Sequence, residues 1–167
     1  SQVSIEYDAT GPTVALTTGS ADPVSGAFTI TATFSEAVTG FAIGDFSVGN
    51  GAASSFSATS STVYTATITP AVDGTVTVDV AGSAAQDGAG NGNVAATQFS
   101  IENDETGPTV ALSTGSADPV SGAFTITATF SEAVTGFAIG DFSVGNGAAS
   151  SFSATSATVY TATITPA

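Results

Sequence analysis

The side chains of this chain that can do chemistry are almost all carboxylates. Fourteen acidic residues occur among 167, and Lys, Arg, His and Cys are all absent, so the formal net charge is −14. General acid–base catalysis draws mostly on His, Lys, Cys, Tyr or a pair of carboxylates, and the first three types are missing here. Crowded carboxylates without cationic partners instead favour a hard cation such as Ca²⁺, which takes roughly six to eight oxygen ligands.

The same composition excludes several classes of partner. Binding to nucleic acid is excluded because no side chain can neutralise a phosphate, and binding to an anionic membrane surface is excluded for the same reason. The lack of cysteine excludes a disulfide framework. Because 42% of the residues are apolar and only 8% are charged, the chain is not of the disordered class. Adaptation to salt or resistance to proteases also explains the missing Lys and Arg, and is compatible with cation binding.

The chain contains one unit written twice. Residues 11–71 and 107–167 align at an offset of 96 and differ at only two positions. These are Thr17, which becomes Ser113, and Ser61, which becomes Ala157. A fixed period of this length indicates a tandem array of one structural unit.

The repeat frame predicts the domain organisation. Residues 1–8 (SQVSIEYD) match residues 97–104 (TQFSIEND), so we expect them to be the last strand of a preceding repeat. Residues 9–104 then form a complete repeat of about 96 residues, and residues 105–167 an incomplete repeat with the first five strands. We expect the chain to be an excerpt of a longer array.

Strict two-residue alternation predicts strands. Phe28, Ile30, Ala32 and Phe34 are separated by threonines, and similar runs recur along the repeat. Successive strand side chains point to opposite faces, so each run has one apolar face and one threonine face. The predicted strands are 12–18, 27–34, 45–49, 53–58, 62–69, 75–81 and 94–102, with one short helical turn before residue 45. Seven short strands per repeat indicate an all-β, immunoglobulin-like Greek-key β-sandwich. A barrel is the alternative.

Four motifs carry a specific resemblance. They are Asp-x-Thr-Gly-Pro-Thr-Val, Phe-Ser-Glu-Ala-Val-Thr-Gly-Phe, Asp-Phe-Ser-Val-x-Asn-Gly and Gln-Asp-Gly-Ala-Gly-Asn. With them the chain resembles the bacterial immunoglobulin-like tandem repeats of giant secreted adhesins, over residues 8–104 once and 104–167 in part. The resemblance implies extracellular or cell-surface modules. In several relatives calcium lies near the repeat junctions and stiffens the rod.

In a sandwich whose strands run alternately up and down, the acidic residues collect at the two ends of each repeat. At the end where the chain enters, the N-terminal pole, we expect Asp8, Glu36, Asp45, Asp87, Asn91 and Asn93. At the other end, the C-terminal pole, we expect Asp22, Asp73, Glu102 and Asp104. The two poles meet at each junction of a head-to-tail array, so calcium is predicted there. Its ligands are predicted to come from Asp8, Glu36, Asp45, Asp87, Asn91, Glu102, Asp104, Glu105, Glu132 and Asp141.

Plain turn chemistry is the alternative explanation of these residues. The run from Asp87 to Asn93 offers several oxygens from one loop, but Asp, Asn and Gly are also ordinary turn formers. Asp45 is a candidate cap of a local turn as well as a candidate ligand. Tyr64 and the phenylalanines lie on alternating apolar faces, so we predict that they form core rather than a sugar-stacking platform.

These features predict a structural extender of a bacterial cell-surface adhesin, located outside the cell: a calcium-stiffened rod that projects a terminal binding domain. The alternatives are a repeat of an extracellular surface filament and a carbohydrate- or protein-binding adhesion module. An enzyme is the weakest hypothesis, because it would need a glycosidase-type carboxylate pair in every copy. The expected partners are neighbouring repeats of the same chain; a surface glycan or protein ligand would bind through other domains.

Overall fold

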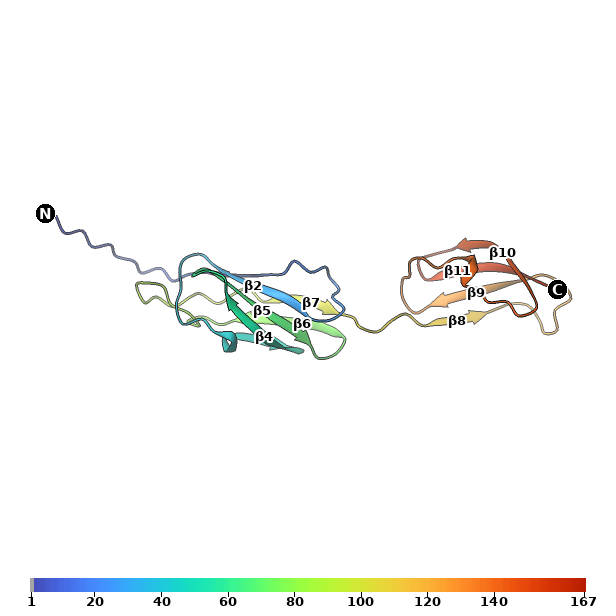
Figure 1. Ribbon diagram of the computed structural model, residues 1–167, viewed down its shortest axis with the longest axis horizontal. Coiled ribbons are helices and arrows are strands. Elements are labelled where there is room, and N and C mark those ends of the chain that lie inside the picture. Colours follow the sequence, from blue (N-terminus) through green and yellow to red (C-terminus); the bar gives the residue numbers. More distant parts are fainter. Residues whose placement is uncertain (1) are drawn as a thin grey trace. The chain divides into compact units, whose positions relative to one another are not determined.

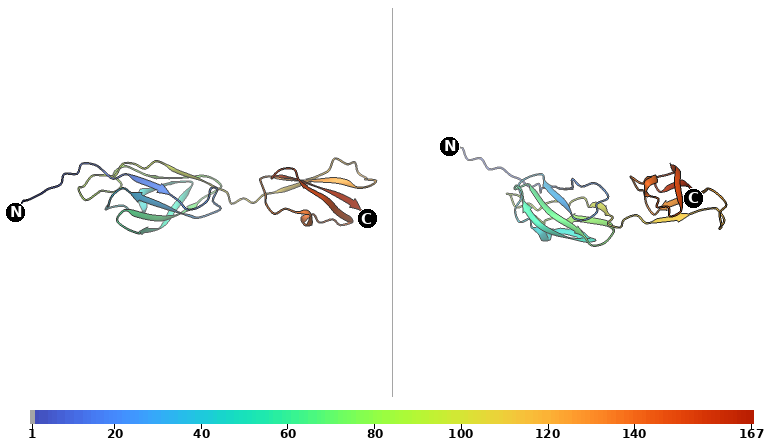
Figure 2. Two further views of the ribbon diagram at one scale, coloured as in Figure 1. Left: turned by 90° about the horizontal axis from the view of Figure 1, so that it is seen from above. Right: turned by 45° about the vertical axis from the view of Figure 1, so that its right-hand side comes forward.

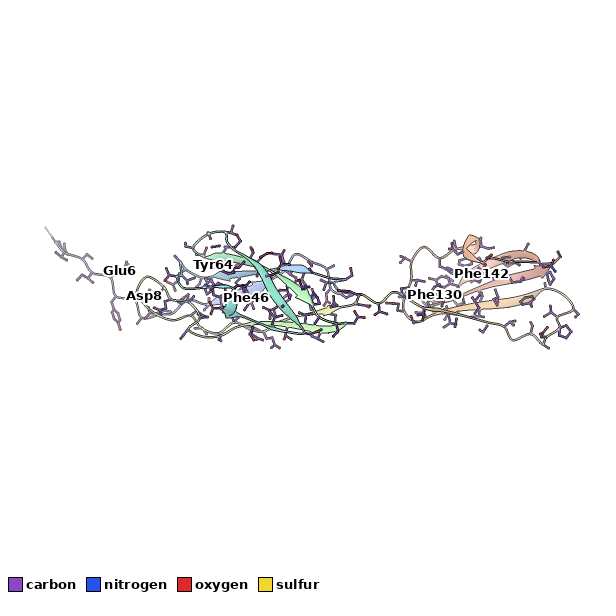
Figure 3. The ribbon with its side chains drawn as sticks, turned by 60° about the horizontal axis from the view of Figure 1, so that its bottom comes forward. Glu6, Asp8, Phe46, Tyr64, Phe130 and Phe142 are labelled. Carbon is purple, nitrogen blue, oxygen red and sulfur yellow. The ribbon has the colours of Figure 1, made fainter. Side chains whose placement is uncertain are left out.

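The computed structural model describes residues 2–167, which form two compact units (Figure 1). The boundary along the chain lies between Thr106 and Gly107, close to the boundary at residue 104 that the repeat frame predicts. Ser1, the first residue of the predicted strand at 1–8, lies outside the described residues. Residues 2–13 carry no strand, and Glu6 lies in this extended segment (Figure 3). The prediction that the segment completes a preceding repeat therefore stays a prediction.

Unit 1 contains seven strands and one short 3₁₀ helix. They are β1 (Val14–Thr17), β2 (Phe28–Phe34), η1 (Ile43–Asp45), β3 (Phe46–Gly49), β4 (Gly51–Ala58), β5 (Val63–Pro70), β6 (Gly74–Val80) and β7 (Phe99–Asn103). One antiparallel sheet has the order β1-β2-β5-β4 and the other the order β3-β6-β7. Two sheets of four and three strands with this winding are the constant-type immunoglobulin arrangement, which confirms the predicted fold (Figures 1 and 2).

The core of unit 1 follows from the alternation. In the β2–β5 ladder Ala32 pairs with Tyr64 and Ile30 with Ala66, and all four side chains are buried between the sheets. The threonines between them face outward. The Tyr64 hydroxyl donates to the carbonyl of Val38 at 3.1 Å, which satisfies the one polar atom that the ring brings inside. Tyr64 and the phenylalanines of unit 1 therefore form core, as predicted.

The last strand is shorter than the predicted range 94–102. The Val94 N–H donates to the carbonyl of Pro12 at 2.8 Å, while the Ala96 N–H donates to Val80 at 2.9 Å. Residues 94–98 thus pass from the segment before β1 to the edge of β6, and regular pairing in β7 begins only at Phe99. Single-strand periodicity does not reveal this change of partner.

Unit 2 repeats only part of the sandwich. Its elements are β8 (Val110–Ser113), β9 (Phe124–Phe130), η2 (Ile139–Asp141), β10 (Gly147–Ala154) and β11 (Val159–Pro166). They form one sheet of order β8-β9-β11-β10. The third of the five strands predicted for this repeat, at residues 141–145, does not form. Its counterpart β3 pairs only with β6, and unit 2 has no counterpart of β6, so the segment lacks a strand with which to share hydrogen bonds.

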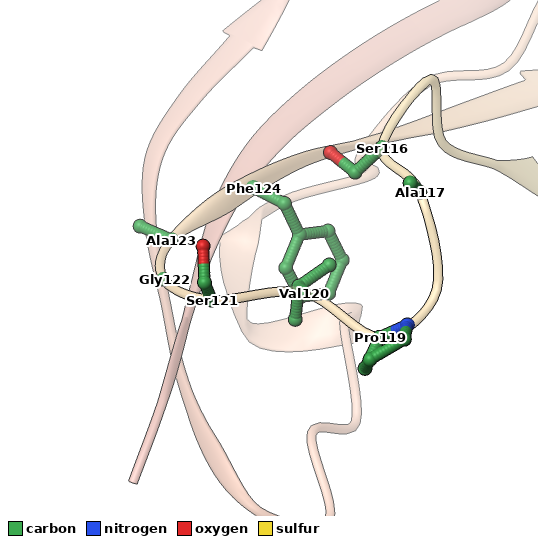
Figure 4. A pocket seen from close by; sticks show the side chains of 8 residues that line it. All are labelled: Ser116, Ala117, Pro119, Val120, Ser121, Gly122, Ala123 and Phe124. Carbon is green, nitrogen blue, oxygen red and sulfur yellow. The ribbon is translucent and has the colours of Figure 1, made fainter.

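The missing second sheet leaves apolar side chains of unit 2 exposed. Val120 is 40% exposed, whereas its counterpart Val24 is 8% exposed and bridges β7. The loop from Ser116 to Phe124 surrounds an open hollow that contains the side chains of Val120 and Phe124 (Figure 4). In unit 1 the corresponding ring, Phe28, packs against Phe99 of the last strand. The hollow therefore corresponds to space that the last strand fills in unit 1.

Residues 105–167 alone are expected to show no cooperative thermal transition, because their one sheet has no opposing layer to bury its apolar face. Residues 8–106, which contain both sheets, are expected to melt cooperatively. Circular dichroism and scanning calorimetry of the two fragments test this. A sharp calorimetric transition from residues 105–167 would contradict the account.

Candidate functional site

Three carboxylates meet at the N-terminal pole of unit 1. One oxygen each from Asp8, Glu36 and Asp87 lie within 4.8 Å of one another, and we call these residues the carboxylate triad. Asp8 lies in the segment before β1, Glu36 follows β2, and Asp87 lies in the long loop after β6. Asp8 is exposed, Glu36 is half-buried and Asp87 is buried. Residues separated by about 80 positions thus converge because the chain re-enters the same pole, as the winding argument predicts.

The loop after β6 is built around the Asp87 carboxylate. Its Oδ1 accepts hydrogen bonds from the backbone N–H groups of Ala89 and Asn91, both at 2.8 Å. Its Oδ2 accepts from the Asn91 side-chain amide at 2.9 Å, and the same amide nitrogen donates to the carbonyl of Asp8 at 3.2 Å. Asn91 therefore positions two members of the triad through its donors. Asn93, which is buried, fixes the far side of the loop by accepting from the Ala85 N–H at 2.8 Å.

The triad is electrostatically strained. Burial raises the pKa of Glu36, and the negative charges of Asp8 and Asp87 raise it further. Burial also acts to raise the pKa of Asp87, but hydrogen bonds from Asn91 and from the N–H groups of the loop outweigh it and lower the pKa below its usual value. No hydrogen bond to the Glu36 carboxylate occurs among residues 2–167. Asp87 is thus held ionised, and Glu36 has two repelling neighbours and no donor.

This arrangement fits a hard cation. Three carboxylates provide oxygen ligands without any competing ammonium or guanidinium group, and calcium accepts irregular cages of carboxylate, carbonyl and water oxygens. An ion bound here would remove the repulsion that raises the pKa of Glu36. Asp8, Glu36 and Asp87 are the residues that would hold it.

Two other predicted ligands have local roles. The Asp45 Oδ2 accepts a hydrogen bond from the N–H of Ala42 at 2.8 Å, and Asp141 accepts from Ala138 at the same distance in unit 2. Each closes the 3₁₀ turn before the next segment, which is the capping alternative that the sequence left open. Neither belongs to the triad. Glu132 occupies the position of Glu36 in unit 2, where the positions matching Val72–Ala96 are not part of the chain.

The remaining predicted ligands lie at the C-terminal pole, where the carboxylates of Glu102 and Asp104 accept hydrogen bonds. The Glu102 N–H donates to Asp22 at 3.0 Å, and the Glu102 carboxylate accepts from the Thr75 hydroxyl at 2.5 Å. The Asp104 carboxylate accepts from the Thr106 N–H at 3.2 Å. The Glu105 N–H, rather than its carboxylate, makes the hydrogen bond that holds this residue.

Asp73 was placed at this pole by the sequence but not among the ligands, and it is the most fully used carboxylate there. Its two oxygens accept from the Glu105 N–H at 2.7 Å and from the Thr106 hydroxyl. These hydrogen bonds lower the pKa of Asp73 against the effect of burial. Sequence reasoning missed Asn103 altogether. It is 3% exposed and its Oδ1 has no hydrogen-bond partner. The two-residue alternation could have indicated its burial, because Asn103 lies on the same face of β7 as Phe99 and Ile101.

Glu36→Gln is expected to raise the melting temperature of unit 1 in the presence of a chelator at neutral pH, because it removes a charge that the fold disfavours. The folded-state pKa of Glu36 lies above the unfolded value, so its destabilising effect is fully present above the folded pKa and disappears as the pH falls below the unfolded one. The difference between variant and wild type should therefore vanish in acid.

Glu132→Gln is the matched control, since it makes the same change in unit 2, outside the triad. Equal effects of the two substitutions, or a destabilising Glu36→Gln in chelator, would contradict the electrostatic account.

Comparison with known proteins places this geometry in a family. The bacterial Ig-like domain family matches residues 8–102 and again residues 104–167. Comparisons with curated proteins and with solved structures gave no match. Among the described residues, no helix has the length and apolarity to cross a membrane. Domains of this family are typically non-catalytic repeat modules of surface proteins, usually found at the cell surface or outside the cell. With two family matches over nearly its whole length and an immunoglobulin-like strand order, the chain belongs to the bacterial Ig-like domain family.

Proposed function

We propose that the chain is an extender module of a bacterial cell-surface adhesin, in which calcium at the N-terminal pole of each repeat stiffens a rod that carries a terminal binding domain. The observation that carries the proposal is the carboxylate triad, because one of its members, Asp8, belongs to the linker that leads into the repeat. A cation held by all three residues would tie the linker to two loops of the repeat that follows.

Near-identity of the two copies supports a mechanical role. Binding or catalytic sites are usually single, whereas tandem copies supply length. His, Lys and Cys, which often serve in catalysis, are absent. The two copies carry the same carboxylates at all of the 61 aligned positions. Each unit with its loops is expected to add on the order of 40 Å, given that a strand of seven or eight residues spans about 25 Å.

A carbohydrate- or protein-binding module has less support. Such a site needs exposed aromatic rings, and the rings of unit 1 pack against one another between the sheets, as in the contact of Phe41 with Phe34 at 5.0 Å between centroids. Tyr7 is exposed, at 91%, in the segment that matches a core strand. A surface filament, the other alternative, would be built from the same rod. It would differ from an extender in that neighbouring chains assemble side by side.

Calcium is expected to raise the melting temperature of unit 1 through preferential binding to the folded state. A site in the extracellular range has a Kd of roughly 10⁻⁴–10⁻³ M. Calcium at about one hundred times its Kd then stabilises the fold by about 2.7 kcal/mol. Glu36→Gln and Asp87→Asn should abolish this gain, so that Glu36→Gln, more stable than wild type in chelator, becomes the less stable protein in calcium.

The control for the calcium effect is Glu132→Gln, which should respond to calcium as wild type does. Melting is compared at fixed ionic strength, because salt alone screens the net charge. An unchanged melting temperature between chelator and excess calcium would refute the metal site.

Small-angle scattering from chains of two, four and six repeats tests the rod itself. With calcium, the maximum dimension should rise in proportion to the number of repeats, and chelation should shorten and broaden the distance distribution. A compact particle whose size does not follow repeat number, or specific glycan binding by one repeat, would favour the binding-module alternative.

A further inference from the structure

The linker after β7 is fastened to unit 1 by one carboxylate. Asp73, in the turn between β5 and β6, accepts the Glu105 N–H on Oδ1 at 2.7 Å and the Thr106 hydroxyl on Oδ2. Two consecutive linker residues thus donate to the two oxygens of a single side chain. Charge-assisted hydrogen bonds of this kind are stronger than neutral ones.

Backbone contacts extend the same attachment. The Val24 N–H donates to the carbonyl of Glu102 at 2.8 Å, and the Asp104 N–H donates to the carbonyl of Val24 at 2.9 Å. The Asp104 carboxylate then accepts the Thr106 N–H, which closes a local turn. Glu102, Asp104, Glu105 and Thr106 thus all take part in these hydrogen bonds. The remaining residue of the segment, Asn103, donates from its side-chain amide to the carbonyl of Val72 at 3.2 Å.

On the other side of the linker, the first anchored residue is Thr109. Its N–H donates to the Ser131 hydroxyl and its carbonyl accepts the Ser131 N–H, both at 2.9 Å. Only Gly107 and Pro108 lie between the two attachments, and the proline ring fixes one of their torsions.

We propose that Asp73 is a linker clamp: it makes residues 104–106 part of the preceding repeat without a metal ion, and thereby reduces the hinge between repeats to Gly107 and Pro108. The clamp stands on the contacts of unit 1 alone; its consequence for the stiffness of an array rests on the proposed function.

Repeat equivalence narrows the hinge further. Gly11 and Pro12 correspond to Gly107 and Pro108, and in unit 1 the loop after β6 holds them. The Val94 N–H donates to the Pro12 carbonyl, and Gly11 lies so close to the Gly92 carbonyl that a Cβ at position 11 would overlap it. In a complete following repeat the corresponding loop would hold Gly107 and Pro108 in the same way, and a side chain at position 107 would then overlap that loop as one at position 11 does.

Amide hydrogen exchange, followed by NMR on the full chain in chelator, tests the clamp. Asp73→Ala is expected to speed exchange of the Glu105 amide by about tenfold or more, since a hydrogen bond to a charged group is lost. The Ile101 amide in β7 should keep its protection, which shows that the sandwich remains folded. Asp79→Asn, which removes an acid from the outer face of β6, should leave Glu105 unchanged.

Two further variants separate the clamp from simple loss of structure. Thr106→Val removes the hydroxyl donor and keeps the Glu105 N–H bond, so Glu105 exchange should stay close to wild type. If Asp73→Ala also exposes Ile101, Asp73→Leu decides the matter, because it keeps the approximate size of the side chain, removes both acceptor oxygens and must still speed Glu105 exchange. Wild-type exchange at Glu105 in a folded Asp73 variant would overturn the proposal. This readout needs neither calcium nor an array, so it can fail or succeed independently of the extender function.

Discussion

The constraint on which the rest of this structure depends is the absence of any cationic side chain. Fourteen carboxylates must be satisfied by N–H and O–H donors or else repel one another, because no Lys, Arg or His can pair them. Most of them accept hydrogen bonds from nearby N–H or O–H donors. Asp45 closes a 3₁₀ turn, Asp79 accepts from the Gln98 amide, and Asp73 holds the linker. Within the carboxylate triad, Glu36 has no donor among the described residues, and its two acidic neighbours add to the effect of burial in raising its pKa. The proposed calcium ion would supply the missing positive charge at the point where the linker enters the repeat.

The fold determines which carboxylates are left in that position. Strands running alternately between two poles return Glu36 and Asp87 to the end at which Asp8 enters, and the donors of Asn91 then fix the loop around Asp87. At the opposite pole Asp73 and Asp104 accept hydrogen bonds from the departing chain itself. Hydrogen bonds fasten the chain at both poles, but within residues 2–167 only at the N-terminal pole does a carboxylate without a donor, that of Glu36, lie beside two other carboxylates.

Much of this was open to prediction from the sequence, because it depends on periodicity and winding. The threonine alternation of Phe28–Phe34 predicts both the strand and its buried face, and the repeat frame predicts the two units. The convergence of Asp8, Glu36 and Asp87 follows from counting strands. Where prediction failed, the deciding interaction was non-local. Residues 142–145 carry the same sequence as a strand of unit 1 but lack a pairing partner, and Val94 turns away to Pro12. The role of Asp73 depends on donors 32 and 33 positions further along the chain, which no local pattern indicates.

The most direct test of the central claim is an anomalous difference map from crystals of the 167-residue chain grown in calcium. The account predicts a peak within roughly 2.3–2.6 Å of carboxylate oxygens of Asp8, Glu36 and Asp87. Crystals in which these three side chains are well ordered and keep their mutual distances, but enclose no anomalous peak, would contradict it.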